Sequence, residues 1–120
     1  MFIEKIMNPL YLTYLMLGLA IVSEVTGSTF LVKSESFTKL WPSIAVFVFF
    51  SIAFYLLSQV IKVIPIGIAY AIWAGVGIIL TAIVGFFVFK HHLDLAAMIG
   101  IGLIVSGVIV INAFSSSAGH

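Results

Sequence analysis

Cysteine and arginine are absent from this 120-residue chain, and charged residues make up only 8% of it. Without cysteine, the chain has no disulfide framework, no thiol nucleophile and no thiolate metal ligand. Five lysines against four acids give a formal net charge of +1, which is too small for the basic surface of a nucleic-acid-binding protein. Soluble domains carry about 25% charged residues, so the composition excludes an ordinary soluble domain and indicates an integral membrane protein.

Hydrophobic residues make up 63% of the chain and gather in four long runs. Each run exceeds the ~20 residues that a helix needs to cross a bilayer. The connecting loops are short, so neighbouring helices must run antiparallel. The runs cover residues 6–32, 40–61, 63–89 and 95–119. We therefore expect an all-α membrane protein, with a single four-helix transmembrane domain over residues 1–120 and approximate spans 10–32, 42–61, 66–89 and 95–114.

The first run is interpreted as a retained helix and not as a cleaved secretory signal. Glu24 interrupts it, and no convincing small-residue cleavage site follows.

The five lysines leave the orientation of the chain in the membrane open. With four crossings, Lys5 and Lys62 lie on one side of the bilayer. Lys33, Lys39 and Lys90 lie on the other. The cytoplasmic side normally carries a clear excess of basic residues, which this distribution does not give. One interpretation is a weak bias that places the first and third loops in the cytoplasm. The other is that both orientations are inserted and pair head to tail.

Glu24 is the one charged residue inside the apolar runs. An acid at the centre of a membrane helix costs about 2.5–3.5 kcal/mol, and intramembrane ionisable residues generally serve a function. No Lys, Arg or His lies inside the runs to pair with it. Desolvation disfavours a charged carboxylate, so such a group can exchange a proton for another cation. The alternative is a carboxyl group near the interface that stays protonated without a functional role.

The helix face around Glu24 leaves room for a ligand. At helical spacing, this face also carries Tyr14, Leu17, Ala20 and Ser28. The side chains nearest the acid are small, which permits either close helix approach or a ligand beside the carboxylate.

Aromatic side chains in the second and third runs are candidates for the walls of a cation site. Phe50, Phe54 and Leu57 recur at helical spacing, as do Tyr70 and Trp73. The π-face of an aromatic ring attracts cations, and a Trp in mid-membrane lies away from the interfacial belt where Trp is enriched. The alternative for both stripes is packing against lipid or other helices.

Glycines suggest motion in the third run and assembly in the fourth. Gly75 and Gly77 lie in the middle of an otherwise apolar helix and are candidates for a hinge. In the fourth run, small residues spaced along the helix predict a groove for another helix, and these are Gly100, Gly102, Ser106 and Gly107. Adjacent histidines, His91 and His92, lack the convergent spacing of a metal site, so no metal is expected.

Four segments carry a recognisable pattern: residues 24–29 (EVTGST), 34–43 (SESFTKLWPS), 64–77 (IPIGIAYAIWAGVG) and 93–94 (LD). With them the chain resembles the small multidrug resistance family, over residues 7–120. The resemblance thus implies that residues 1–6 are an extension without function. It looks like the branch that exports quaternary ammonium and other lipophilic aromatic cations in exchange for protons. The guanidinium-exporting branch typically has a Gly just before the membrane Glu and a Trp three residues after it. This chain has Ser23 and Gly27 there, so that branch is the alternative.

The resemblance implies a homodimer of four-helix protomers inserted in opposite orientations, which selects the head-to-tail interpretation of the lysines. It also implies that the two copies of Glu24 form the shared proton and substrate site. Tyr70 and Trp73 match the family's binding aromatics, and Tyr14 and Phe54 match further pocket positions.

The resemblance further implies that residues 100–108 form the dimerisation segment. Two departures from the family pattern matter here. Phe50 takes the place of a pocket tyrosine and removes a hydroxyl group, and His92 takes the place of a loop arginine.

Together these observations predict a secondary active transporter, not an enzyme, that crosses the bacterial cell (inner) membrane several times. The expected partners are protons, lipophilic cationic molecules, membrane lipid and a second copy of the chain, without cofactor or nucleic acid. Two other classes stay open: a non-transport membrane assembly subunit that uses the glycine surfaces, and a channel without coupled proton movement.

Overall fold

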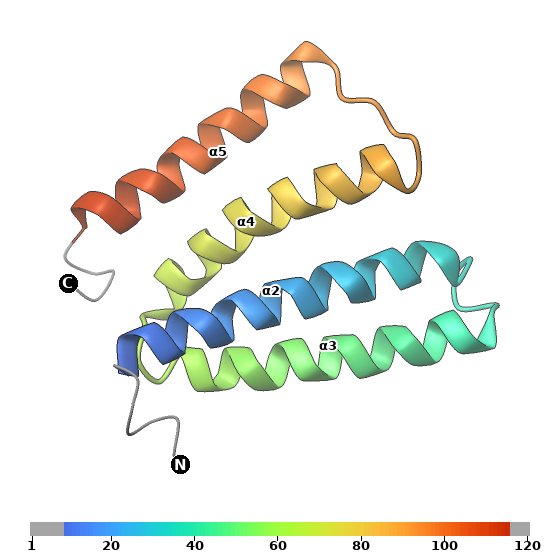
Figure 1. Ribbon diagram of the computed structural model, residues 1–120, viewed down its shortest axis with the longest axis horizontal. Helices are drawn as coiled ribbons and strands as arrows, with labels where there is room; N and C mark the ends of the chain where they lie inside the picture. Colours follow the sequence, from blue (N-terminus) through green and yellow to red (C-terminus); the bar gives the residue numbers. More distant parts are fainter. Residues whose placement is uncertain (1–8, 116–120) are drawn as a thin grey trace. The chain divides into compact units, whose positions relative to one another are not determined.

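The computed structural model describes residues 9–115, and these residues form four α-helices without a strand among them. The helices are α2 (Pro9–Lys33), α3 (Leu40–Val60), α4 (Ile66–Phe87) and α5 (Leu95–Phe114) (Figure 1). The expected extension, residues 1–6, lies outside the described residues.

All four helices are long and apolar enough to cross a membrane. They contain 25, 21, 22 and 20 residues. At about 1.5 Å of rise per residue they reach or exceed the ~30 Å hydrocarbon thickness of a bilayer. The prediction of an all-α protein with four apolar helices is confirmed.

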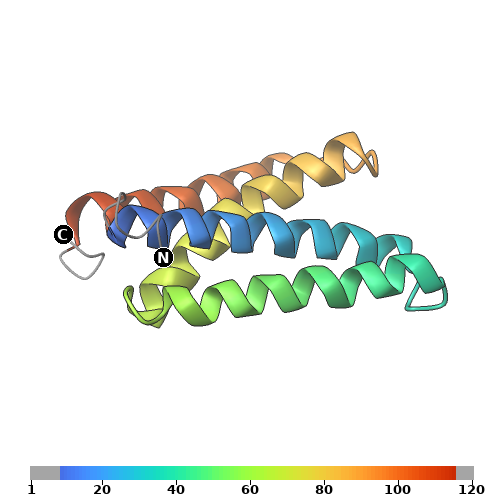
Figure 2. The same ribbon diagram turned by 60° about the horizontal axis from the view of Figure 1, so that its bottom comes forward.

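The chain forms two compact units, which divide between Ile64 and Pro65. The first unit holds the antiparallel hairpin of α2 and α3, which lie side by side along their length in both ribbon views (Figures 1 and 2). The rings of Phe30 and Phe49 stack at a centroid distance of 5.9 Å across this hairpin.

A side-chain hydroxyl organises the turn between α2 and α3. Ser34 is fully buried, and its Oγ donates a hydrogen bond to the carbonyl of Leu31 at 2.7 Å. The same Oγ accepts one from the backbone N–H of Phe37 at 3.1 Å. The backbone is left-handed at three successive positions, Glu35, Ser36 and Phe37, although none is glycine. Ser34 therefore supplies hydrogen bonds that hold an otherwise unfavourable backbone path.

The second unit holds α4 and α5, joined by residues 88–94. α4 begins at Ile66, directly after Pro65, and continues as a regular helix through Gly75 and Gly77. α5 begins after Asp94, whose carboxylate accepts a hydrogen bond from the backbone N–H of Ala97 at 2.8 Å. None of the residues of α5 is buried.

Candidate functional site

Glu24 lies in the C-terminal half of α2 and is partly buried. Its nearest recorded polar partner is Ser28, one turn further on, whose Oγ donates to Oε1 at 3.4 Å, a long and weak hydrogen bond. The four described helices contain one more charged residue besides Glu24, which is Lys33 at the end of α2. It lies about 14 Å further along the helix axis. No basic group forms an ion pair with Glu24 among residues 9–115.

The ring of Phe50 lies against Gly27, one helical turn from the carboxyl group. A Cβ atom built at Gly27 would lie 2.9 Å from both Cδ2 and Cε2 of that ring, and 3.3 Å from Cβ of Phe49. The absence of a side chain at position 27 is therefore what lets α3 place an aromatic ring against this part of α2. The sequence pattern singled out Gly27 and Phe50 separately, but gave no sign that they touch.

The other predicted site residues of α2 and α3 differ in exposure. Leu17, Ala20 and Leu57 are buried side chains of the core. Tyr14 and Ser28 are partly buried, as are Glu24 and Phe50. Phe54 is exposed and lies 6.3 Å from Phe50, ring centroid to ring centroid, with the planes tilted by 32°. The hairpin thus brings the acid and one of its candidate aromatics into one region.

Tyr70 and Trp73 form a second aromatic pair, on α4. Their ring centroids are 6.4 Å apart and their planes are tilted by 32°. Tyr70 is exposed and Trp73 is partly buried. The spacing of three residues predicted that these rings share one helix face, and their proximity agrees with that geometry.

The glycines of α4 occupy two different environments. A Cβ atom at Gly75 would lie 2.6 Å from Cγ2 of Val108 on α5, so this glycine permits a close approach of the two helices. A Cβ atom at Gly77 would meet only Cδ1 of Trp73, at 3.7 Å. The sequence identified Gly75 as a hinge candidate and missed its packing contact, because nothing local to Gly75 indicates Val108. The hinge role of Gly75 and Gly77 stays a prediction.

The glycines of α5 are not sites of close packing in the part of the chain that the structure describes. There, a Cβ atom at Gly100, Gly102 or Gly107 would meet nothing within 4 Å. The hydroxyl of Ser106 donates to the carbonyl of Gly102, on the same helix. Their role in dimerisation stays a prediction.

A comparison with known families matches residues 12–104 to the family described as Small Multidrug Resistance protein. This match covers well over half of the chain. The chain belongs to the small multidrug resistance family. The resemblance predicted from the sequence segments is therefore confirmed.

Similar proteins in this family align over nearly their whole length. The quaternary ammonium compound-resistance protein QacG of Staphylococcus sp. (strain ST94) is 48% identical over 87% of this chain and 97% of its own. The multidrug transporter EmrE of Escherichia coli (strain K12) is 47% identical over 95% of this chain and 100% of its own. The quaternary ammonium compound-resistance protein QacE of Escherichia coli is 45% identical over 89% of this chain and 97% of its own.

Membership of the small multidrug resistance family and the four apolar helices make the chain a multi-pass protein of the bacterial inner membrane. The predicted localisation is confirmed.

Proposed function

We propose that this small multidrug resistance protein is a secondary active antiporter that exports lipophilic aromatic or quaternary ammonium cations in exchange for protons. Glu24 carries the proposal, because it is an acid within an apolar helix and has no basic partner among the described residues. Similar proteins named as a multidrug transporter and as quaternary ammonium compound-resistance proteins support the same class of substrate.

In this proposal, the Glu24 carboxylate binds either a proton or a substrate cation, but not both at once. A protonated carboxyl group is neutral and needs no counter-charge in an apolar span. An ionised carboxylate there is costly unless a cation lies nearby. The chain offers no such cation in the described helices, so the counter-charge comes from the substrate. One carboxylate then holds either a proton or a cation, and exchange of one for the other couples their movements.

Aromatic rings provide the selectivity for lipophilic cations. The Phe50–Phe54 and Tyr70–Trp73 pairs present apolar faces that attract quaternary ammonium groups through the ring quadrupole. Tyr14, Leu17, Ala20, Ser28 and Leu57 are proposed as further pocket residues.

The contact between Gly27 and Phe50 favours this branch over guanidinium export. The resemblance places a Trp at this position in the guanidinium branch, whereas even a Cβ atom here would lie 2.9 Å from the Phe50 ring. A larger side chain at position 27 would have to displace that ring. In the proposed site, the aromatic ring beside position 27 therefore comes from Phe50 of α3 and not from position 27 itself.

Assembly as a head-to-tail homodimer is part of the proposal. Small residues of α5 permit close approach of a second copy, because a Cβ atom built at any of its three glycines would meet no described residue within 4 Å. These small residues are Gly100, Gly102, Ser106 and Gly107. A rocking motion at Gly75 and Gly77 would then expose the paired Glu24 sites to alternate sides of the membrane.

Proton release from the purified protein tests the proposal. We expect tetraphenylphosphonium to release protons and guanidinium to release few or none, because the aromatic faces favour a large apolar cation. Glu24→Gln should abolish the release, whereas Glu35→Gln, which changes an exposed loop acid, should leave it unchanged. Release that survives Glu24→Gln would overturn the proposed coupling, and a larger response to guanidinium would favour the other branch.

A further inference from the structure

Thr81 forms a side-chain hydrogen bond to one of the two glycines in the middle of α4. Its hydroxyl donates to the carbonyl oxygen of Gly77, one turn earlier, at 2.5 Å. In the regular helix the same oxygen also accepts the backbone N–H of residue 81. The carbonyl of Gly77 therefore has two donors, a backbone donor and a side-chain donor, and both belong to Thr81.

α4 is held closely on α5 at Gly75 and is free of α5 at Gly77. A Cβ atom built at Gly75 would lie 2.6 Å from Cγ2 of Val108. A Cβ atom built at Gly77 would meet Cδ1 of Trp73 at 3.7 Å, and no described atom of α5 within 4 Å. The close packing of α4 on α5 that Gly75 permits has thus ended half a turn later, at the glycine whose carbonyl Thr81 binds.

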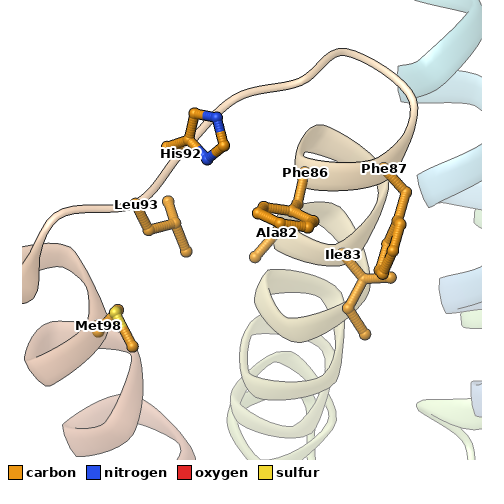
Figure 3. A pocket seen from close by; sticks show the side chains of 7 residues that line it. All are labelled: Ala82, Ile83, Phe86, Phe87, His92, Leu93 and Met98. Carbon is orange, nitrogen blue, oxygen red and sulfur yellow. The ribbon is translucent and has the colours of Figure 1, made fainter.

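Beyond Gly77, an apolar groove opens between α4 and α5. It encloses about 410 Å³ beside their connecting loop, and no described side chain fills it. Figure 3 shows Ala82 and Phe86 of α4 on one side of the groove, with Leu93 and Met98 across from them. α4 continues for about 15 Å beyond Gly77, so a bend of about 20° there would move the end of the helix by about 5 Å.

A bend at Gly77 needs a second donor for the carbonyl that it frees. The backbone bond from residue 81 to Gly77 spans the turn in which such a bend falls. No water replaces a broken backbone bond in hydrocarbon, and Ser and Thr hydroxyls are among the groups that satisfy freed carbonyls in membrane helices. The hydroxyl bond of Thr81 can lengthen by about 0.5 Å and still be a hydrogen bond.

We propose that Thr81 is a positioning residue, whose hydroxyl keeps the Gly77 carbonyl bonded while α4 bends and so sets how fast the substrate site changes sides. This inference rests on the antiport function and the rocking motion proposed above. A bend at Gly77 reaches the proposed binding aromatics, because the indole of Trp73 lies against this glycine.

The alternative is that the bond only gives the Thr81 hydroxyl a partner within the membrane. Other hydroxyls of the helices form the same kind of bond, as Thr26 does to the carbonyl of Val22 at 2.7 Å. The acceptor of Thr81 differs, because it belongs to a glycine at the point where close packing ends and the groove begins. This alternative predicts that removal of the hydroxyl leaves the motion of α4 unchanged.

Exchange NMR of the full-length protein in lipid nanodiscs can separate the two. Amide signals of α4 on both sides of Gly77 report the exchange rate without substrate or a proton gradient. Thr81→Val keeps the shape of the side chain and removes the hydroxyl, and it should slow this exchange about fivefold, as expected for one lost hydrogen bond. Thr81→Ser should restore the rate. Thr26→Val removes the same bond from α2 and is the matched control, which should leave the rate unchanged.

Transport and binding measurements distinguish positioning from substrate contact. In liposomes, Thr81→Val should lower the turnover rate for tetraphenylphosphonium by a similar factor, while calorimetry gives an unchanged Kd. Circular dichroism verifies that the helices form. The proposal is overturned if α4 of the original chain shows no exchange, or if exchange is unchanged in Thr81→Val. Slow exchange in Thr81→Ser, equal slowing by Thr26→Val, or a weaker Kd in Thr81→Val would also overturn it.

Failure of the antiport function gives a different result. In that case the original chain shows exchange in α4, but tetraphenylphosphonium releases no protons from it. The dependence of the exchange rate on the Thr81 hydroxyl would still be measured, and would show whether this residue controls the bend of α4.

Discussion

The two helical hairpins of this chain differ in how much of their packing is completed internally. In α2–α3, Gly27 receives the ring of Phe50, Phe30 stacks on Phe49, and both helices contribute buried side chains. In α4–α5, the close approach is at Gly75 and Val108, a groove opens beside the loop, and α5 has no buried residue. Since lipid is as apolar as leucine, helices in membranes associate through fitted packing and not through the hydrophobic effect.

In the proposed mechanism, this difference separates the hairpin that holds the coupling acid from the hairpin whose helix surfaces stay open. The acid of the helices, Glu24, belongs to the internally packed pair. The open small-residue face of α5 and the apolar groove belong to the other pair. Close packing of α2 on α3 would hold the proposed coupling acid in place, whereas the open surfaces of α4 and α5 would be available to the proposed second copy.

The largest expected effect on transport comes from a substitution in the α2–α3 hairpin. Glu24→Gln should abolish resistance of cells to a quaternary ammonium compound, because a glutamine neither holds an exchangeable proton nor neutralises a cation. Resistance is measured as growth at increasing concentrations of the compound, with expression matched by immunoblot. Asp94→Asn, which neutralises an acid in the other hairpin, is the control and should retain resistance. Equal loss in both variants would contradict the assignment of the chemistry to α2–α3.

Next in size is a change at the contact between α4 and α5. Gly75→Ala places a methyl group 2.6 Å from Val108, and overpacking of this kind typically costs about 1–3 kcal/mol. We expect a lower free energy of unfolding, measured by denaturant titration in detergent micelles. Gly67→Ala, at a position of the same helix where a Cβ meets nothing within 4 Å, is the matched control.

A compensating substitution distinguishes packing at Gly75 from flexibility. Val108→Ala removes the methyl groups that the new side chain would meet, so the double variant should recover much of the lost stability. If stability recovers while transport stays low, Gly75 also serves as a hinge. Absence of any recovery would argue against the observed register of α4 on α5.

Most of the fold follows from where charges interrupt apolar sequence. A bilayer requires about 20 apolar residues for each crossing, so four long runs separated by ionisable residues leave few alternatives to four helices. Glu24 was equally visible as a candidate, because an acid without a basic partner stands out in such a composition. Both inferences use only which residues occur in a run, and neither needs to know which helices touch.

What the sequence could not provide is the register between helices. Gly27 meets Phe50, and Gly75 meets Val108, only because of how far one helix is shifted along and rotated about the other. Helices that are apolar on every side carry no amphipathic stripe to specify that shift. The backbone path of the turn after α2 could not be predicted either. Its left-handed residues, Glu35 to Phe37, include no glycine and rely on the buried hydroxyl of Ser34.

A smaller effect is expected where α2 meets α3. Gly27→Ala brings a methyl group 2.9 Å from the Phe50 ring, whose edge can shift, and we expect destabilisation of about 1 kcal/mol. The displaced ring should also weaken tetraphenylphosphonium binding, measured by calorimetry. Gly18→Ala, on the same helix but with nothing within 4 Å, is the control. If Gly27→Ala binds normally, the ring of Phe50 is not a wall of the substrate site.

The smallest effect concerns how the second helix of each hairpin begins. α5 starts with a side-chain cap from Asp94 to the N–H of Ala97, whereas Lys39 before α3 provides no such bond. Asp94→Ala should therefore destabilise the start of α5 by about 1 kcal/mol, the usual value of an N-cap. Hydrogen exchange at the Ala97 amide should become about fivefold faster, which corresponds to that energy. Asp94→Asn, which can still accept the bond, should exchange nearly as slowly as the original chain. Lys39→Ala should leave the first turn of α3 unaffected, and a comparable acceleration there would show that the two hairpins do not differ in this respect.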